Sequence, residues 1–213
     1  MATKSILFDL DGTLTDSGEG IMKCALLALN HYGIDVPNMN VLRSFVGPPL
    51  WDSFVRFGIK PEEADNAVEV YRSRYLTVGK FENFPYPGIH DLLRKLKADG
   101  HKLYVATSKP EPTAIEIIEY FQLAEFFEII CGATYDGTRG SKADVIAYLL
   151  SQCGQIENIV MVGDTAYDVI GAKAHGIPTV GVSWGYGKIE DMEQAGAAGI
   201  ANTMDELYEL ILK

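Results

Sequence analysis

The feature that most constrains the fold is a series of short apolar runs, each too short for a helix. They are rich in Val, Ile and Leu and lie at 5–10, 102–107, 127–132, 158–164 and 178–183. Segments with helical periodicity lie between them, for example at 88–100 and 141–154, where apolar residues share a face and a glycine follows. Strands that are apolar on both faces and alternate with helices are typical of a covered parallel sheet. We therefore predict an α/β fold with a doubly wound parallel sheet.

One long stretch breaks this alternation. From about residue 18 to 79 the pattern is helical throughout, with glycine after each segment and proline at the start of two of them. The flanking stretches TLTDSGEG and GKFENFPYPG are rich in turn residues, as expected of hinges. We predict a core domain made of 1–15 and 82–213, with a small inserted α-helical cap domain at 16–81.

The charge balance restricts the partners. The chain has 18 basic and 29 acidic residues, a formal charge of -11, which disfavours nucleic acid and anionic membrane surfaces. Asp9 and Asp11 interrupt the opening apolar run, and no run of about 18 apolar residues follows. Three widely spaced cysteines suit buried thiols in a reducing compartment. We expect a cytoplasmic protein, monomer or homodimer, with no membrane partner.

Acidic side chains follow two of the predicted strands. Asp9 and Asp11 lie at the end of the first, and Asp164 and Asp168 lie at or just beyond the end of the fourth. Ligands of open α/β sheets bind beyond the carboxyl ends of the strands, so we expect these groups to meet. The first pair alone would also fit a turn in which an aspartate accepts backbone hydrogen bonds. Four converging carboxylates, however, would repel one another unless a cation lay between them.

The donor set favours magnesium. All candidate ligands are oxygens, namely those of Asp9, Asp11, Asp164 and Asp168, and Mg²⁺ prefers carboxylates, water and phosphate oxygens. The four histidines show no metal-ligand spacing. Such an ion would shield a phosphate group from the acidic site. One aspartate can then attack phosphorus, and a second acid two residues along can protonate the leaving oxygen and later deprotonate water.

Other residues suit the transferred phosphoryl group. Ser108 is placed to cap a helix whose first turn holds Pro110, which would turn backbone N–H groups toward an anion. Thr107 adds a hydroxyl donor, and Gly12 is a further phosphate-binding candidate. Lys142 would be an ammonium clamp, although a solvated surface lysine is the alternative interpretation.

Four stretches, in this order, carry a resemblance to a known family: FDLDGTLTDS, VATSKP, GSKADVI and MVGDTAYDVIGAKAHGIPTVGV. They resemble the motifs of the haloacid dehalogenase superfamily of magnesium-dependent phosphatases, in the branch with a helical cap after the first motif. The match covers nearly the whole chain. The family usually has asparagine where this chain has Ser108, which leaves that side chain without an implied role.

The resemblance implies a role for each motif residue. Asp9 would be the nucleophile and Asp11 the general acid/base, while Thr107 and Lys142 would hold the phosphate. Asp164 would bind the metal together with Asp9 and the Asp11 carbonyl. Asp168 would act through the metal's waters or by fixing its loop.

Within that branch the chain is similar to the phosphoglycolate phosphatase and 5'-nucleotidase group, through VLRSFVGPPLWDSF, YDGTRGSKADVIAYLL and GVSWGYG. We expect a small phosphorylated metabolite as substrate, with specificity set in the insert by Arg43, Phe45 and the turn at Gly47. A core phenylalanine and a solvated arginine are the alternative there. The WGYG stretch at 184–187 either borders the crevice or packs over the sheet end, and we favour packing.

Other functions remain open at this point. A receiver-type signalling domain also uses an aspartate phosphoacceptor on a doubly wound sheet, but it lacks the insert and the second acid. A hexose-phosphate mutase of the same branch would return the phosphate to a sugar. A haloalkanoate dehalogenase would have no use for magnesium, Asp11 or a phosphate clamp.

Overall fold

The chain divides into two compact units. A computed structural model describes residues 2–213. One unit contains the chain up to Thr15 and from Pro85 to Lys213, and the other is Asp16–Phe84. The short strands β2 (Thr15–Asp16) and β3 (Phe84–Pro85), which pair in a two-stranded sheet, lie where the chain passes between the units. The second crossing is therefore at 84/85, where the sequence suggested 81/82. That the helical unit acts as a cap stays a prediction.

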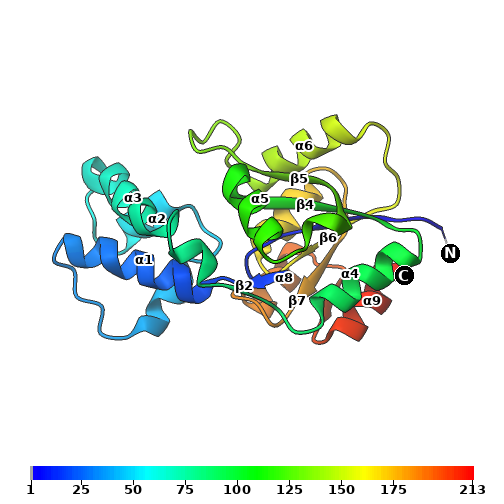
Figure 1. Ribbon diagram of the computed structural model, residues 1–213, viewed down its shortest axis with the longest axis horizontal. Helices are drawn as coiled ribbons and strands as arrows, with labels where there is room; N and C mark the ends of the chain where they lie inside the picture. The colour runs from blue at the N-terminus through cyan, green and yellow to red at the C-terminus, as the bar shows by residue number, and fades with distance from the viewer. Residues whose placement is uncertain (1) are drawn as a thin grey trace. The chain divides into compact units, whose positions relative to one another are not determined.

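The first unit is built on a six-stranded sheet with the order β5-β4-β1-β6-β7-β8 (Figure 1). Its pairs are parallel, and β1 lies between β4 and β6. The strands are β1 (Ser5–Phe8), β4 (Lys102–Pro110), β5 (Phe127–Ala133), β6 (Ile159–Gly163), β7 (Thr179–Val182) and β8 (Gly199–Ala201). Each of the five apolar runs forms a strand, which confirms the predicted α/β class, while β8 was not predicted.

Helices cover both faces of this sheet. They are α4 (Ile89–Ala98), α5 (Glu111–Tyr120), α6 (Lys142–Cys153), α7 (Ala166–Lys173), α8 (Ile189–Ala195) and α9 (Met204–Leu212), with a 3-10 turn η3 (Ala124–Phe126). On β1, Ile6 and Phe8 pack with the apolar faces of α4, α5 and α9. Leu7 points the other way and packs with α6 and α7. This alternation buries every side chain of β1, as expected for a central strand.

The second unit is helical. It contains α1 (Gly18–His31), a 3-10 helix η1 (Met39–Phe45), α2 (Leu50–Arg56), α3 (Pro61–Tyr75) and a 3-10 turn η2 (Gly79–Phe81). Aromatic rings form part of its core, with Phe54 packed between Phe45 and Tyr71. No helix in residues 2–213 is long and apolar enough to cross a bilayer.

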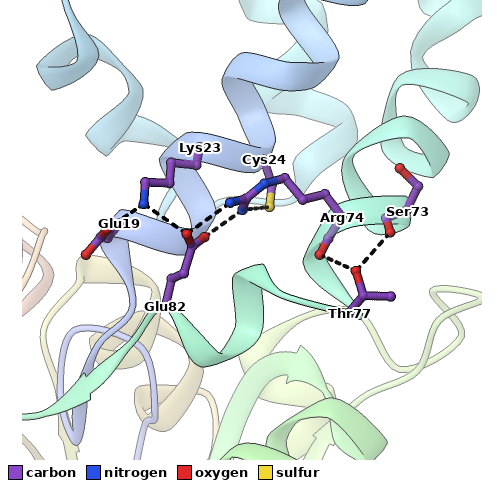
Figure 2. Close-up of polar contacts among 7 residues, drawn as sticks. All are labelled: Glu19, Lys23, Cys24, Ser73, Arg74, Thr77 and Glu82. Carbon is purple, nitrogen blue, oxygen red and sulfur yellow. Dashed lines mark hydrogen bonds and ion pairs between the residues drawn. The ribbon is translucent and has the colours of Figure 1, made fainter.

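An ion-pair cluster joins the ends of this unit (Figure 2). The Glu82 carboxylate accepts two hydrogen bonds from the Arg74 guanidinium, at 2.6 and 2.9 Å, and one from the Lys23 ammonium at 2.9 Å. Lys23 also pairs with Glu19, and Arg74 donates to the Cys24 thiol sulfur at 3.3 Å. Glu82 precedes the second crossing by two residues, so the cluster ties that segment to α1 and α3.

Candidate active site

Three of the four predicted carboxylates meet at the carboxyl ends of β1 and β6. Asp9, Asp164 and Asp168 are buried, and each offers an oxygen within 4.8 Å of the others. The two strands are neighbours, and the Asp9 N–H donates to the Val162 carbonyl at 2.9 Å. They also mark the place where strand order reverses, since β4 and β5 extend the sheet from β1 and β7 and β8 extend it from β6. Ligands of doubly wound folds bind at such a switch point.

Lys142 brings the positive charge to this cluster. Its ammonium lies 2.8 Å from Asp9 Oδ1 and 2.8 Å from Asp168 Oδ1, and it donates to the Ala106 carbonyl at 2.9 Å. The residue is the first of α6, whose N-cap Ser141 holds the helix start in place by a hydrogen bond from the Asp144 N–H. Lys142 is 5% exposed, so the alternative of a solvated surface lysine does not apply.

Burial and neighbouring charges shift the pKa values of Asp164, Asp168 and Lys142. Burial raises the pKa of Asp164 well above its usual range, and the neighbouring Asp168 and Asp9 raise it further. Burial also raises the pKa of Asp168, although Lys142 acts against this. For Lys142, burial acts to lower the pKa, but the attraction of Asp168 and Asp9 prevails and raises it. One ammonium therefore offsets only part of the acidic charge.

Asp164 is fixed by neutral groups. Its Oδ2 accepts the Tyr186 N–H at 2.8 Å and its Oδ1 accepts the Thr13 hydroxyl at 3.3 Å. Gly12 makes room for it, because a Cβ at Gly12 would overlap the Asp164 carboxylate and because its φ of 82° disfavours other residues. The Gly12 N–H already donates to the Thr15 carbonyl at 2.8 Å. A phosphate contact by Gly12 stays a prediction.

The fourth carboxylate, Asp11, lies outside the cluster of three. Its Oδ2 is 2.8 Å from the ammonium of Lys109, a partner that the sequence analysis missed. Both side chains are largely buried, with exposed fractions of 13% for Asp11 and 5% for Lys109. Its other oxygen, Oδ1, is buried and accepts no hydrogen bond from the residues that the structure describes.

The second motif lies at the end of β4. Thr107 is buried beside the Ala106 carbonyl that Lys142 contacts, and its Oγ1 accepts the Lys109 N–H at 3.2 Å. The prediction that Ser108 caps the next helix is wrong. Strand β4 continues to Pro110, which is the N-cap of α5 and lacks a side-chain donor or acceptor, and α5 begins at Glu111. Ser108 is half-buried in the strand.

Asp168 fixes the loop after β6. Its Oδ2 accepts both the N–H and the hydroxyl of Thr165, at 3.0 and 2.8 Å, while its Oδ1 pairs with Lys142. The side chain is fully buried. The loop-fixing role that the resemblance implied for Asp168 is thus supported by direct contacts.

The residue types at this site fit a hard divalent cation. The three clustered ligand atoms are all carboxylate oxygens, and Asp164 accepts hydrogen bonds from two neutral groups, the Thr13 hydroxyl and the Tyr186 N–H. A cation among them would relieve the repulsion that raises the pKa of Asp164. Asp9, Asp164 and Asp168 are therefore the side chains that can hold a metal ion.

The predicted specificity residues lie in the helical unit. Arg43 is exposed on η1, and Gly47 follows in a turn with a φ of 104°. Phe45 is 2% exposed, and its ring lies 5.1 Å from that of Phe54 and 4.9 Å from that of Phe57. These contacts favour the alternative interpretation of Phe45 as a core residue. Contact of Arg43 or Gly47 with a substrate stays a prediction.

The WGYG loop proves to support the site. Besides the Tyr186 N–H on Asp164, the Trp184 indole N–H donates to the Thr13 carbonyl at 3.2 Å. Trp184 also packs on the core of the first unit. The favoured prediction of packing is thus correct for the Trp184 ring, but the loop also borders the acidic cluster.

Comparison with known proteins agrees with this geometry. Residues 6–182 match the model of a family described as "Haloacid dehalogenase-like hydrolase". The chain belongs to the haloacid dehalogenase-like hydrolases. This membership confirms the resemblance and decides against a receiver-type signalling domain.

Several known proteins are similar to this chain along most of its length. The tyrosine-protein kinase PtkA of Mycobacterium tuberculosis is 44% identical over 209 residues, which are 97% of this chain and 72% of that protein. A 5'-nucleotidase of Pseudomonas aeruginosa is 42% identical over 190 residues, 88% of this chain and 86% of that one. A crystal structure described as a predicted phosphatase from Clostridium acetobutylicum has a TM-score of 0.94 and 43% identity, and the match covers 100% of this chain and 99% of that one.

Proposed function

We propose that this chain is a Mg²⁺-dependent phosphomonoester hydrolase that forms an aspartyl-phosphate on Asp9. The observation that carries the proposal is the buried cluster of Asp9, Asp164 and Asp168, two of which, Asp9 and Asp168, pair with Lys142, in a member of a hydrolase family. Asp9, Asp164 and the Asp11 carbonyl would hold the ion. When bound, Mg²⁺ supplies positive charge that offsets the charge of the phosphoryl oxygens.

The side chains divide the reaction into two displacements. The Asp9 carboxylate attacks phosphorus while the bond to the leaving oxygen breaks, and Asp11 gives that oxygen its proton. Asp11 then removes a proton from water, whose oxygen bonds to phosphorus and releases Asp9. Lys142 and Thr107 bind the phosphoryl oxygens, in keeping with the 2.8 Å contact between Lys142 and Asp9.

The substrate in this proposal is a small phosphorylated metabolite. The relative named 5'-nucleotidase and the motif resemblance to phosphoglycolate phosphatases favour a nucleoside monophosphate or phosphoglycolate. Arg43 and Gly47 of the helical unit would contact the part of the substrate that leaves.

The test is release of phosphate from a panel of phosphomonoesters with Mg²⁺, compared with EDTA. We expect turnover by the native chain and a loss of at least about a thousandfold in Asp9→Asn, since the nucleophile is removed. Asp65→Asn, an exposed carboxylate on α3, is the matched control and keeps full activity. Activity that survives Asp9→Asn, or cleavage of pyrophosphate alone, would contradict the proposal.

A second candidate is transfer of the phosphoryl group to an acceptor other than water. The relative named tyrosine-protein kinase, at 44% identity, favours it, and a sugar-phosphate mutase would share the same first step. Turnover in ¹⁸O-labelled water separates these functions. Hydrolysis places the label in inorganic phosphate, whereas transfer to a tyrosine or a sugar leaves the phosphate unlabelled and bound to the acceptor.

A further inference from the structure

We infer that Lys109 is a positioning residue for Asp11: it holds one carboxylate oxygen so that the other faces the reacting oxygen. The inference rests on the proposed function, because it concerns the proton that Asp11 gives and takes. It starts from the two unlike oxygens of Asp11. Oδ2 is held at 2.8 Å by the Lys109 ammonium, whereas Oδ1 is buried and without a hydrogen-bond donor among residues 2–213.

The backbone of β4 directs Lys109 toward this contact. The pairing of β4 with β5 is regular from Tyr104 to Thr107 and shifts register before Pro110, so Ser108 and Lys109 lie in an irregularity of the strand. Such bulges re-aim side chains. The Lys109 N–H donates to Thr107 Oγ1 at 3.2 Å, which links the lysine to the proposed phosphate-binding hydroxyl.

A second ion pair, between Glu111 and Arg139, fixes the chain just after this irregular segment to β5. The Glu111 carboxylate accepts the Gly132 N–H at 3.1 Å and an Arg139 N–H at 2.9 Å, and Arg139 donates to the Gly132 carbonyl at 2.7 Å. Gly132 allows the approach, because a Cβ there would overlap the Lys109 carbonyl and the Glu111 backbone. These contacts fix the backbone next to Lys109, whose side chain is 5% exposed.

This geometry assigns different tasks to the two oxygens. In the first displacement the Asp11 Oδ1–H bond breaks, its proton passes to the leaving oxygen, and the phosphorus bond shifts from that oxygen to Asp9. In the second, Oδ1 takes a proton from the attacking water as the bond between Asp9 and phosphorus breaks. Lys109 keeps its protons throughout and only fixes the orientation of the carboxylate.

The test compares leaving groups in single-turnover experiments. In Lys109→Met we expect phosphorylation of Asp9 by an alkyl phosphate to slow by roughly tenfold or more, because an alkoxide needs the proton. The nitrophenolate of p-nitrophenyl phosphate leaves without needing a proton. With this substrate, the rate of Asp9 phosphorylation in Lys109→Met should stay within about threefold of the native rate. Slow attack by water should also let the aspartyl-phosphate accumulate, which acid quenching and intact mass can measure.

Three further variants make the outcome decisive. Lys109→Arg keeps the charge and should recover most of the alkyl phosphate rate. In an Asp11→Asn background, Lys109→Met should not change the ratio between the two substrates. Lys102→Met, exposed at the opposite end of β4, is the matched control and should leave both rates unchanged.

The inference is overturned if Lys109→Met lowers the rate of Asp9 phosphorylation equally for both substrates, or for neither of them, while the native chain is active. Failure of the proposed function looks different, since the native chain would then release no phosphate or Asp9→Asn would stay active. If Lys109→Met does not fold, Lys109→Gln replaces it: a lower alkyl-to-aryl rate ratio than in the native chain supports the inference, and an unchanged ratio with normal folding contradicts it.

Discussion

At the scale of single residues, the site gathers negative charge where water is largely excluded. Among the described residues, Asp164 accepts hydrogen bonds only from neutral groups, Thr13 and Tyr186, while Asp9 and Asp168 share one ammonium. Buried like charges repel strongly in a medium of low dielectric constant. Without a cation, the cluster therefore lowers the free energy of unfolding.

Asp164→Asn should reverse this effect. It removes one charge while its amide oxygen can still accept from Tyr186, so we expect a higher melting temperature than the native chain in EDTA, by roughly 2–4 °C for each kcal/mol of relieved repulsion. Mg²⁺ should raise the melting temperature of the native chain but not that of the variant. Calorimetry with and without Mg²⁺ measures both. A variant that Mg²⁺ stabilises as much as the native chain would exclude Asp164 as a ligand.

Residue roles could be predicted where a motif and a strand end coincide. Asp9, Asp164 and Asp168 follow apolar runs closely enough for the pattern alone to bring them together. Lys109 and Tyr186 could not be recognised in this way, because their contacts join segments 98 and 22 residues apart and depend on a register shift and a loop conformation. The sequence did contain one signal for Lys109, because this lysine lies within the second motif, TSKP, close to the expected phosphate site.

At the scale of elements, the strands were predictable because burial on both faces leaves a continuous apolar run. The end of β4 was not, since Ser108 looks like a helix cap in sequence but continues the strand, where pairing with β5 decides its conformation. In the same way, 39–45 has helical spacing but forms a 3-10 helix rather than an α-helix. The three-residue strand β8 is too short to give a pattern.

The ion-pair cluster at Glu82 contributes to the stability of the helical unit, and this contribution depends on pH. Hydrogen bonds from Arg74, and then those from Lys23, lower the pKa of Glu82 to about 2. A lowered pKa means that this carboxylate stabilises the fold above its ordinary pKa of 4.5 and that the contribution is lost as the pH falls toward 2. The Glu82 side chain is 21% exposed, so solvent weakens the effect.

Glu82→Gln should therefore destabilise the helical unit by about 1–2 kcal/mol at pH 7, and the difference from the native chain should shrink from pH 4.5 downward. Urea unfolding in a Trp184→Phe background measures this, because Trp51 then reports on the helical unit alone. Glu69→Gln, which removes an exposed pair with Arg72 on α3, serves as control and should cost less than about 0.5 kcal/mol. A pH-independent difference would show that packing, not charge, holds the segment.

At the scale of the whole molecule, the chain places its chemistry and its proposed specificity in different units. The acidic cluster belongs to the first unit, whereas Arg43 and Gly47 belong to the second, and two crossings connect them. Turnover of a small generic substrate should then depend little on the helical unit.

Arg43→Ala should accordingly lower kcat/KM about tenfold for the preferred substrate of the panel, the loss of one charged contact of about 1.4 kcal/mol. The value for p-nitrophenyl phosphate should change less than twofold. Arg72→Ala, which replaces a half-buried arginine of the helical unit, is the control. Equal losses on both substrates would remove Arg43 from specificity.

The central position of β1 in the sheet also has a consequence for folding during synthesis. Of the strands of this sheet it comes first in the sequence, yet it lies between β4 and β6, and Ile159 is the first residue of that second neighbour. On the ribosome, this buried strand keeps an open edge until β6 has emerged, a period in which it can pair with other nascent chains. The centre of the sheet is thus completed only once β6 has been synthesised, and a prematurely terminated product lacking β6 would be a candidate for chaperone binding rather than an enzyme with partial activity.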